Sequence, residues 1–199
     1  LNPEALQKAL ATKGASIATG MQQLLADLRK GHVSQTDESV FEVGRNVATS
    51  PGSVVFENEF FQLIEYKPLT AKVYERPMLF VPPCINKYYI LDLQPDNSLV
   101  AHAVAQGHAV FLVSWRNAGP EQGNLGWDDY LEQGVMQAID VALAISGADR
   151  ANTLGFCIGG TLLASALAVL AARGEDKAAS LTLLTTMLDF SNTGELGLM

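Results

Sequence analysis

An uncharged stretch of 22 residues, 151–172, most constrains how this 199-residue chain can fold. Its length meets the simplest criterion for a membrane-spanning helix. Its first half, however, is interrupted by glycines and polar residues, namely Asn152, Thr153, Gly155, Gly159, Gly160 and Thr161. Such residues favour a buried strand, a tight turn and a buried helix in succession. The sequence therefore predicts a strand–turn–helix unit inside a folded protein and no membrane span.

Three more apolar segments alternate with helical ones in the second part of the chain. The predicted strands cover residues 78–81, 109–115, 152–156 and 181–186, and the predicted helices cover residues 97–106, 127–145 and 158–172. Strands that are apolar on both faces and alternate with helices are typical of a mostly parallel sheet with helices on both faces. We therefore expect an α/β fold whose last strands follow residue 199.

The N-terminal part has a different pattern. Asn2 and Pro3 predict the start of a helix, Gly14 separates it from a second helix, and Gly31 ends that one. Phe41 and Val43 are expected on a further short helix. Strands at 54–56 and 60–66, joined at 57–59, predict a hairpin. We expect a helical region over residues 1–50 and the first part of a catalytic domain over residues 51–199.

Composition excludes several classes of protein. Apolar residues make up 48% and charged residues 17% of the chain, which excludes a disordered or fibrous protein. The net charge of −8 argues against a nucleic-acid partner. The two cysteines, Cys84 and Cys157, form no CxxC pair, and HExxH is absent. We expect neither a disulfide scaffold nor a metal site, and a reducing cytosol is the default compartment.

A candidate nucleophile lies where the third parallel strand meets its helix. Residues 155–159 read Gly-Phe-Cys-Ile-Gly, the G-x-C-x-G pattern of a nucleophile elbow, with cysteine where lipases place serine. The backbone of such a turn is strained, so Gly155 and Gly159 are expected to avoid side-chain collisions. The helix N-terminus favours a thiolate at Cys157, and the N–H of Ile158 is a predicted oxyanion donor. A buried structural cysteine is the alternative.

The elbow requires partners from other strand ends. A second oxyanion donor is expected from the loop after residue 81, at the N–H of Ile85, whereas Cys84 is expected to be a structural loop residue. A thiol nucleophile also needs a base, and in this fold an acid and then a histidine follow the nucleophile in the chain. All three histidines, His32, His102 and His108, precede Cys157, and Asp189 comes too early for the usual acid.

Several segments resemble the polyhydroxyalkanoate synthase family. They are PPCINKYYILDLQP at 82–95, FLVSWRN at 111–117, LGFCIGGT at 154–161, LTLLTTMLDF at 181–190, and the TDES and FEVGRNVA segments within 36–48. The resemblance covers essentially the whole chain and is strongest to the class I type, which polymerises short-chain hydroxyacyl units. It implies an α/β-hydrolase core preceded by a helical region. It also implies a homodimer that is cytoplasmic and associated with polyester granules.

The resemblance further implies a reaction. Cys157 would take acyl groups from (R)-3-hydroxyacyl-CoA as thioesters and pass them to a growing polyester, with CoA as the leaving group and no cofactor. The family's catalytic Asp and His are expected beyond Met199, so residues 1–199 alone are expected to be inactive and poorly folded. Two alternatives remain open: a cysteine-type hydrolase, either a thioesterase or a polyester depolymerase, and a non-catalytic granule-associated module.

Overall fold

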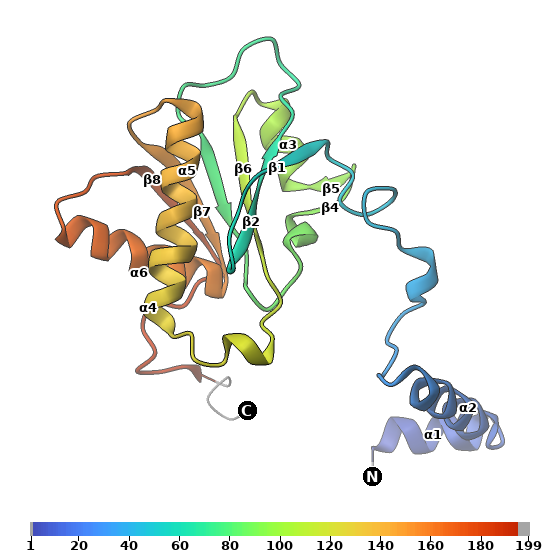
Figure 1. The fold of residues 1–199 in the computed structure, drawn as a ribbon. Helices are drawn as coiled ribbons and strands as arrows, with labels where there is room; N and C mark the ends of the chain where they lie inside the picture. Colours follow the sequence, from blue (N-terminus) through green and yellow to red (C-terminus); the bar gives the residue numbers. More distant parts are fainter. Residues whose placement is uncertain (1, 195–199) are drawn as a thin grey trace. The chain divides into compact units, whose positions relative to one another are not determined.

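The computed structural model describes residues 2–194 and shows two compact units, Leu1–Glu42 and Val43–Met199 (Figure 1). The second unit includes residues 43–50, and hydrogen bonds described below join Ala48 and Ser50 to Asp92. The expected division into residues 1–50 and 51–199 stays a prediction.

The N-terminal unit contains the two predicted helices, α1 (Pro3–Ala11) and α2 (Ala15–Lys30). The side chain of Asn2 caps α1 by accepting hydrogen bonds from the N–H groups of Glu4, at 2.9 Å, and Ala5, at 3.3 Å. Gly31 ends α2 in the left-handed conformation, at φ 82°, and its N–H donates to the carbonyl of Asp27. The helix boundaries predicted from capping residues are therefore confirmed.

The short helix expected around Phe41 and Val43 is wrong in position. A single 3₁₀ turn, η1 (Glu38–Val40), precedes it, capped by the side chain of Asp37. Phe41 is extended, and Val43 forms an isolated bridge with Val47. The turn begins closer to the N-terminus than expected because the carboxylate of Asp37 caps it there. The spacing of apolar residues, from which the helix was predicted, does not reveal this cap.

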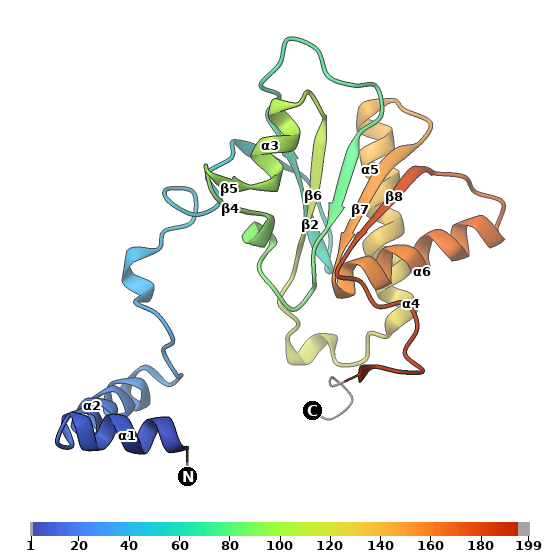
Figure 2. The ribbon, with the colours of Figure 1, turned by 180° about the vertical axis from the view of Figure 1, so that it is seen from behind.

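The second unit is built on a six-stranded sheet in the order β1-β2-β6-β3-β7-β8 (Figures 1 and 2). Its strands are β1 (Gly52–Glu57), β2 (Phe61–Tyr66), β3 (Met78–Val81), β6 (Val110–Trp115), β7 (Ala151–Phe156) and β8 (Ala178–Leu184). From β6 to β8 the neighbours are parallel, whereas β1 and β2 form the predicted antiparallel hairpin, which pairs with β6. The mostly parallel sheet is confirmed.

A strand and a helix have bounds that differ clearly from those predicted from the sequence. The strand expected over 181–186 is Ala178–Leu184, because its N-terminal residues pair with the start of β7 and Thr185 leaves the sheet at φ 45°. The helix expected from residue 97 is α3 (Leu99–Ala105), because β5 (Asn97–Ser98) first pairs with β4 (Asp92–Gln94). Short 3₁₀ turns cover Tyr88–Leu91 (η2) and Pro120–Gln122 (η3).

Helices cover both faces of the sheet, as predicted (Figures 1 and 2). On one face α3 packs on the buried side chains of Phe80, Leu112 and Leu154. On the other lie α6 (Ile158–Ala172) and one long helical segment, which comprises α4 (Trp127–Asp129), the π-helical η4 (Tyr130–Met136) and α5 (Gln137–Ser146). The uncharged stretch 151–172 is thus divided between β7 and α6. Within residues 2–194, no helix has the length and apolarity needed to cross a membrane.

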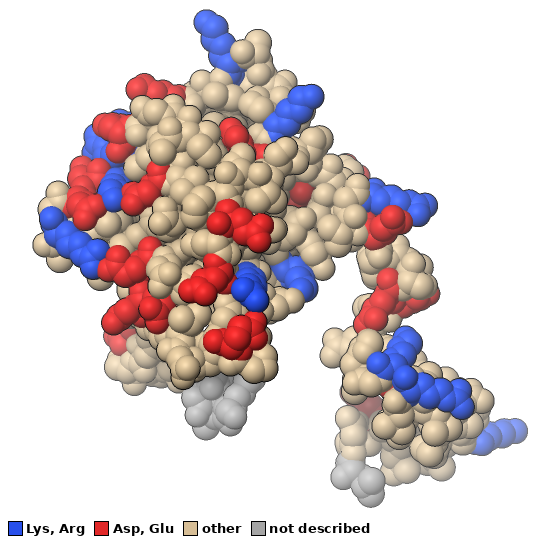
Figure 3. All heavy atoms as spheres, in the orientation of Figure 1, with Lys and Arg blue, Asp and Glu red and all other residues tan. Residues whose placement is uncertain are grey.

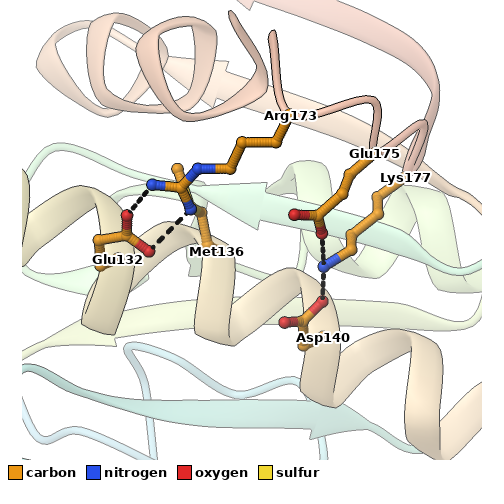
Figure 4. A network of polar contacts seen from close by, with 6 residues as sticks. All are labelled: Glu132, Met136, Asp140, Arg173, Glu175 and Lys177. Carbon is orange, nitrogen blue, oxygen red and sulfur yellow. Dashed lines mark hydrogen bonds and ion pairs between the residues drawn. The ribbon is translucent and has the colours of Figure 1, made fainter. Parts of the chain in front are cut away.

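Ion pairs connect the end of α6 to the long helical segment beneath it (Figure 4). The guanidinium of Arg173 binds the carboxylate of Glu132, and this hydrogen bond lowers the pKa of Glu132. The ammonium of Lys177 lies 2.7 Å from Asp140 and 2.6 Å from Glu175. These contacts orient the α6–β8 connection, and exposed pairs of this kind add little to stability.

A buried carboxylate joins the segment before β1 to β4 in the two-stranded β4–β5 sheet. Asp92 is only 1% exposed and accepts hydrogen bonds at 2.6 Å from the hydroxyls of Ser50 and Ser98. Its carboxylate also accepts the N–H of Ser50 at 3.2 Å, and its carbonyl accepts the N–H of Ala48 at 2.9 Å. One side chain therefore holds together parts of the chain 42 residues apart.

Replacing this carboxylate should destabilise the protein. Asp92→Ala leaves two hydroxyls and an N–H without their acceptor, and we expect the free energy of unfolding to fall by about 3 kcal/mol. Asp96, four residues on, is exposed, so Asp96→Ala should change it by less than about 0.5 kcal/mol. Urea unfolding of the full-length protein measures both. Equal effects of the two substitutions would contradict a special role for Asp92.

Candidate active site

The candidate site lies where the order of the strands reverses. From β3 the chain crosses to β6 on one side, and from β6 it returns to β7 on the other side of β3. The loops that leave the carboxyl ends of β3 and β7 therefore diverge, and ligands of parallel α/β sheets bind in the crevice at this position. Cys157 directly follows β7, and Ile85 lies in the loop after β3. The topology thus brings the predicted nucleophile and the loop of the second oxyanion donor to one edge of the sheet.

The backbone of Cys157 is strained and held at both ends. Its dihedral angles are φ 53° and ψ −128°, a conformation that costs a non-glycine residue on the order of 1–3 kcal/mol. Its N–H donates to the carbonyl of Leu184 on β8 at 2.9 Å, and its carbonyl accepts the N–H of Gly160 at 2.9 Å. Strand pairing on one side and the first turn of α6 on the other therefore stabilise the strained residue. Its side chain stays partly exposed.

Three glycines around the turn allow close backbone contacts. A Cβ on Gly155 would overlap the backbone of Gly160, lying 2.9 Å from its nitrogen. A Cβ on Gly159 would overlap the carbonyl oxygen of Val81 and lie 2.7 Å from the carbonyl carbon of Pro82. Real Cβ atoms essentially never come this close to another atom. At both glycines the atoms that a Cβ would meet belong to the main chain, which cannot easily move aside. Gly159 thereby packs α6 directly against the end of β3.

Gly160 belongs to the same arrangement, and the G-x-C-x-G pattern did not identify it. A Cβ there would overlap the side chain of Thr186, just after β8. The hydroxyl of Thr161 also donates to the carbonyl of Met187 at 2.8 Å. The first turn of α6 is therefore packed against the segments that follow both β3 and β8. In the sequence, the only sign of this contact is that a second glycine, Gly160, directly follows Gly159.

The two predicted oxyanion donors are main-chain groups in different loops. Ile158 is the first residue of α6, where an N–H has no acceptor inside the helix. Ile85 lies in a turn closed by a 3.2 Å hydrogen bond from the N–H of Asn86 to the carbonyl of Pro83, and its side chain is 80% exposed. Among residues 2–194, neither N–H donates a hydrogen bond. Their role as oxyanion donors stays a prediction.

A tryptophan fixes the start of this loop. The indole N–H of Trp115, at the end of β6, donates to the carbonyl of Pro82 at 2.8 Å, and the contact is buried. The ring packs against Gly134, where a Cβ would lie 2.9 Å from it. Sequence analysis did not assign Trp115 to the site, because the hydrogen bond joins residues 33 positions apart.

Cys84 occupies the same turn as Ile85. It is half-buried, packs against the main hydrophobic cluster and forms no disulfide. Burial raises the pKa of the Cys84 thiol, and the neighbouring Cys157 raises it further. The second cysteine therefore lies near the elbow.

None of the three histidines belongs to the loops that directly follow the carboxyl ends of β3 and β7. His32 binds Glu38 in the N-terminal unit, His102 is exposed on α3, and His108 precedes β6, at the opposite end of the strands. Asp189 is exposed, and the hydrogen bond from the N–H of Ser191 lowers its pKa. The catalytic Asp and His expected beyond Met199 lie outside the described residues.

Other ligand classes find little support on the described surface. Residues 2–194 contain no group of three or more His, Cys, Asp or Glu side chains arranged to hold a metal ion. On the face drawn in Figure 3, acidic and basic side chains of these residues are interspersed, without the continuous basic stripe that nucleic acids require.

Several solved structures share this fold. A provisionally assigned esterase from Staphylococcus aureus matches with a TM-score of 0.55 and 17% identity, over 80% of this chain and 50% of its own. A mutant of the esterase rPPE matches with a TM-score of 0.54 and 14% identity, over 78% of this chain and 48% of its own. At this level of identity the likeness shows the fold alone. Residues 77–198 also match the family model of the alpha/beta hydrolase fold.

Sequence relatives are considerably closer. The poly(3-hydroxyalkanoate) polymerase subunit PhaC of Cupriavidus necator is 62% identical over 97% of this chain, and the poly(3-hydroxyalkanoate) polymerase of Methylorubrum extorquens is 43% identical over 98%. The chain spans about a third of the length of these curated relatives, 33% in both cases. Residues 1–103 match the family model described as the N-terminus of poly-beta-hydroxybutyrate polymerase. The chain therefore belongs to the poly-beta-hydroxybutyrate polymerase (PhaC) family and contains the first part of its α/β-hydrolase fold.

Proposed function

We propose that the full-length protein polymerises (R)-3-hydroxyacyl units from their CoA thioesters, with Cys157 as the covalent nucleophile. The observation that carries the proposal is the strained elbow at Cys157, which directly follows β7 and directly precedes α6. The curated relatives, which are named poly(3-hydroxyalkanoate) polymerases, support the same reaction.

The geometry supports a two-stage acyl transfer. The sulfur of Cys157 attacks the thioester carbonyl, and the carbonyl oxygen takes up the negative charge. The N–H groups of Ile158 and Ile85 bind this oxygen, and the intermediate collapses to a Cys157 thioester as the CoA thiolate leaves and is protonated. The hydroxyl of the next unit or chain end then attacks that thioester, which forms an ester bond and regenerates Cys157.

This reaction needs groups that residues 2–194 do not place at the site. A base must accept the proton of the attacking hydroxyl, and an acid must orient it. We propose that both come from the part of the protein that follows Met199, as they do in the family this chain resembles. We further propose short-chain substrates, no cofactor, a homodimer and a cytoplasmic location at the surface of polyester granules.

A hydrolase remains the second candidate because residues 155–159 have the spacing of the nucleophile elbow that lipases use. The same elbow would then transfer the acyl group to water instead of a hydroxyacyl chain. Incubating the full-length protein with 3-hydroxybutyryl-CoA separates the two. Insoluble polymer formed together with CoA supports the polymerase, whereas CoA release with free 3-hydroxybutyrate alone would establish a hydrolase.

Substitution of the nucleophile should abolish turnover. Cys157→Ala removes the group that carries the acyl chain, and we expect CoA release to fall by at least about 10³-fold. Cys157→Ser should also be severely impaired, because a hydroxyl is much harder to ionise than a thiol near neutral pH. CoA release from 3-hydroxybutyryl-CoA measures both, with the melting temperature as a check on folding. A folded Cys157→Ala protein that keeps more than a few per cent of wild-type turnover would exclude the covalent mechanism.

Adding one carbon at the elbow should be disruptive. Gly159→Ala directs a Cβ at the carbonyls of Val81 and Pro82, so we expect a loss of about 1–3 kcal/mol in unfolding free energy and a fall in activity. Gly20→Ala on α2, where a Cβ meets nothing within 4 Å, should be neutral or slightly stabilising. Urea unfolding and CoA release would be measured for both variants. An unaffected Gly159→Ala protein would show that the close contact is not required.

A further inference from the structure

The two thiols of the chain leave the sheet from neighbouring strands. β3 and β7 are hydrogen-bonded partners, with Val81 opposite Gly155 at their carboxyl ends. Cys84 follows Val81 by three residues, and Cys157 follows Gly155 by two. Parallel neighbours lie about 4.8 Å apart, so the two segments that carry the cysteines begin side by side. A disulfide requires that the Cα atoms of the two cysteines come within about 4.4–6.8 Å of each other.

Backbone packing holds the beginnings of the two loops together before the chain leads to opposite faces of the sheet. The hydrogen bond from Trp115 fixes the carbonyl of Pro82, and Gly159 packs directly on that same peptide group. The turn from Pro83 to Asn86 then carries Cys84. The charge of a Cys157 thiolate is close enough to raise the pKa of Cys84. Both side chains are partly exposed, so a small oxidant can reach them.

We propose that Cys84 and Cys157 form a reversible oxidation site, at which a hydroperoxide oxidises Cys157 and Cys84 traps the product as an intramolecular disulfide. The proposal rests on Cys157 being the reactive nucleophile of the proposed function. It assigns Cys84 a role that neither acyl transfer nor packing requires.

The chemistry balances in two steps. The thiolate of Cys157 attacks the O–O bond of the hydroperoxide, which forms a sulfenic acid and releases water or an alcohol once the leaving oxygen is protonated. The sulfur of Cys84 then attacks the sulfenic sulfur, which forms the S–S bond and releases a second molecule of water. Sulfur is oxidised and peroxide oxygen is reduced. Because Cys84 is half-buried with a raised pKa, we expect the oxidant to react first at Cys157.

The disulfide would protect the enzyme from irreversible damage. A sulfenic acid without a neighbouring thiol is oxidised further to a sulfinic acid, which thiols do not reduce. A disulfide is reduced by thiol exchange and returns the free nucleophile. Oxidation is therefore expected to stop acyl transfer reversibly while Cys84 is present.

The test uses the full-length protein and hydrogen peroxide. After treatment and alkylation of free thiols, non-reducing proteolysis and mass spectrometry should find a peptide pair joined through Cys84 and Cys157, and dithiothreitol should restore most of the lost activity. In Cys84→Ser, treated in parallel, we expect sulfinic acid at Cys157 and less than about a tenth of that recovery, with each protein compared with its own untreated activity. In Cys157→Ser, Cys84 should stay reduced at the same peroxide concentration.

Three outcomes would overturn the proposal: sulfinic acid at Cys157 of the wild-type protein without a linked peptide, linkage of Cys157 to a different cysteine, or equal recovery in Cys84→Ser. The linked peptide is detected without any turnover. A protein that forms it but makes no polymer would therefore contradict the proposed function and not the oxidation site.

Discussion

The candidate site depends on one contact between main-chain groups, that of Gly159 in α6 with the carbonyls of Val81 and Pro82 at the end of β3. No side chain fits between them, so the distance between the elbow and the next loop is set by backbone atoms. The position of Cys157 relative to the loop that carries Ile85 follows from this packing.

In the proposed site, main-chain groups bind the oxyanion, whereas side chains carry out nucleophilic attack and proton transfer. Both proposed oxyanion donors are N–H groups, so the side chains of Ile85 and Ile158 are not required to bind the oxyanion, and that of Ile85 is 80% exposed. The strain at Cys157 is balanced by strand pairing to Leu184 and by the first turn of α6. The proposed nucleophile and the two proposed oxyanion donors thus lie within a chain that spans a third of the relatives' length. Proton transfer needs side chains, and we propose that other strand ends supply them.

The parts of the structure that could be predicted from sequence are those with a local cause. Asn2 and Gly31 mark helix ends through their own hydrogen bonds, and the central parallel strands β3, β6 and β7 are recognisable because most of their residues are buried. The elbow has a fixed local spacing of glycines. The order of the strands, the clamp of Trp115 on Pro82 and the packing of Thr186 on Gly160 join distant residues, and a single sequence contains no pattern for such pairs.

A thiol at the elbow suits the proposed acyl transfer but also makes Cys157 sensitive to oxidation. A thiolate exchanges readily with thioesters, which suits acyl transfer from CoA, but the same electron-rich sulfur reacts with peroxides. The fold cannot bury Cys157 without closing the crevice to substrate. It places a second, less reactive sulfur in the adjacent loop, at Cys84, where the contact that positions the oxyanion donors also keeps the beginnings of the two loops together. One close backbone packing therefore accounts for both the proposed catalytic geometry and the proposed protection of the nucleophile.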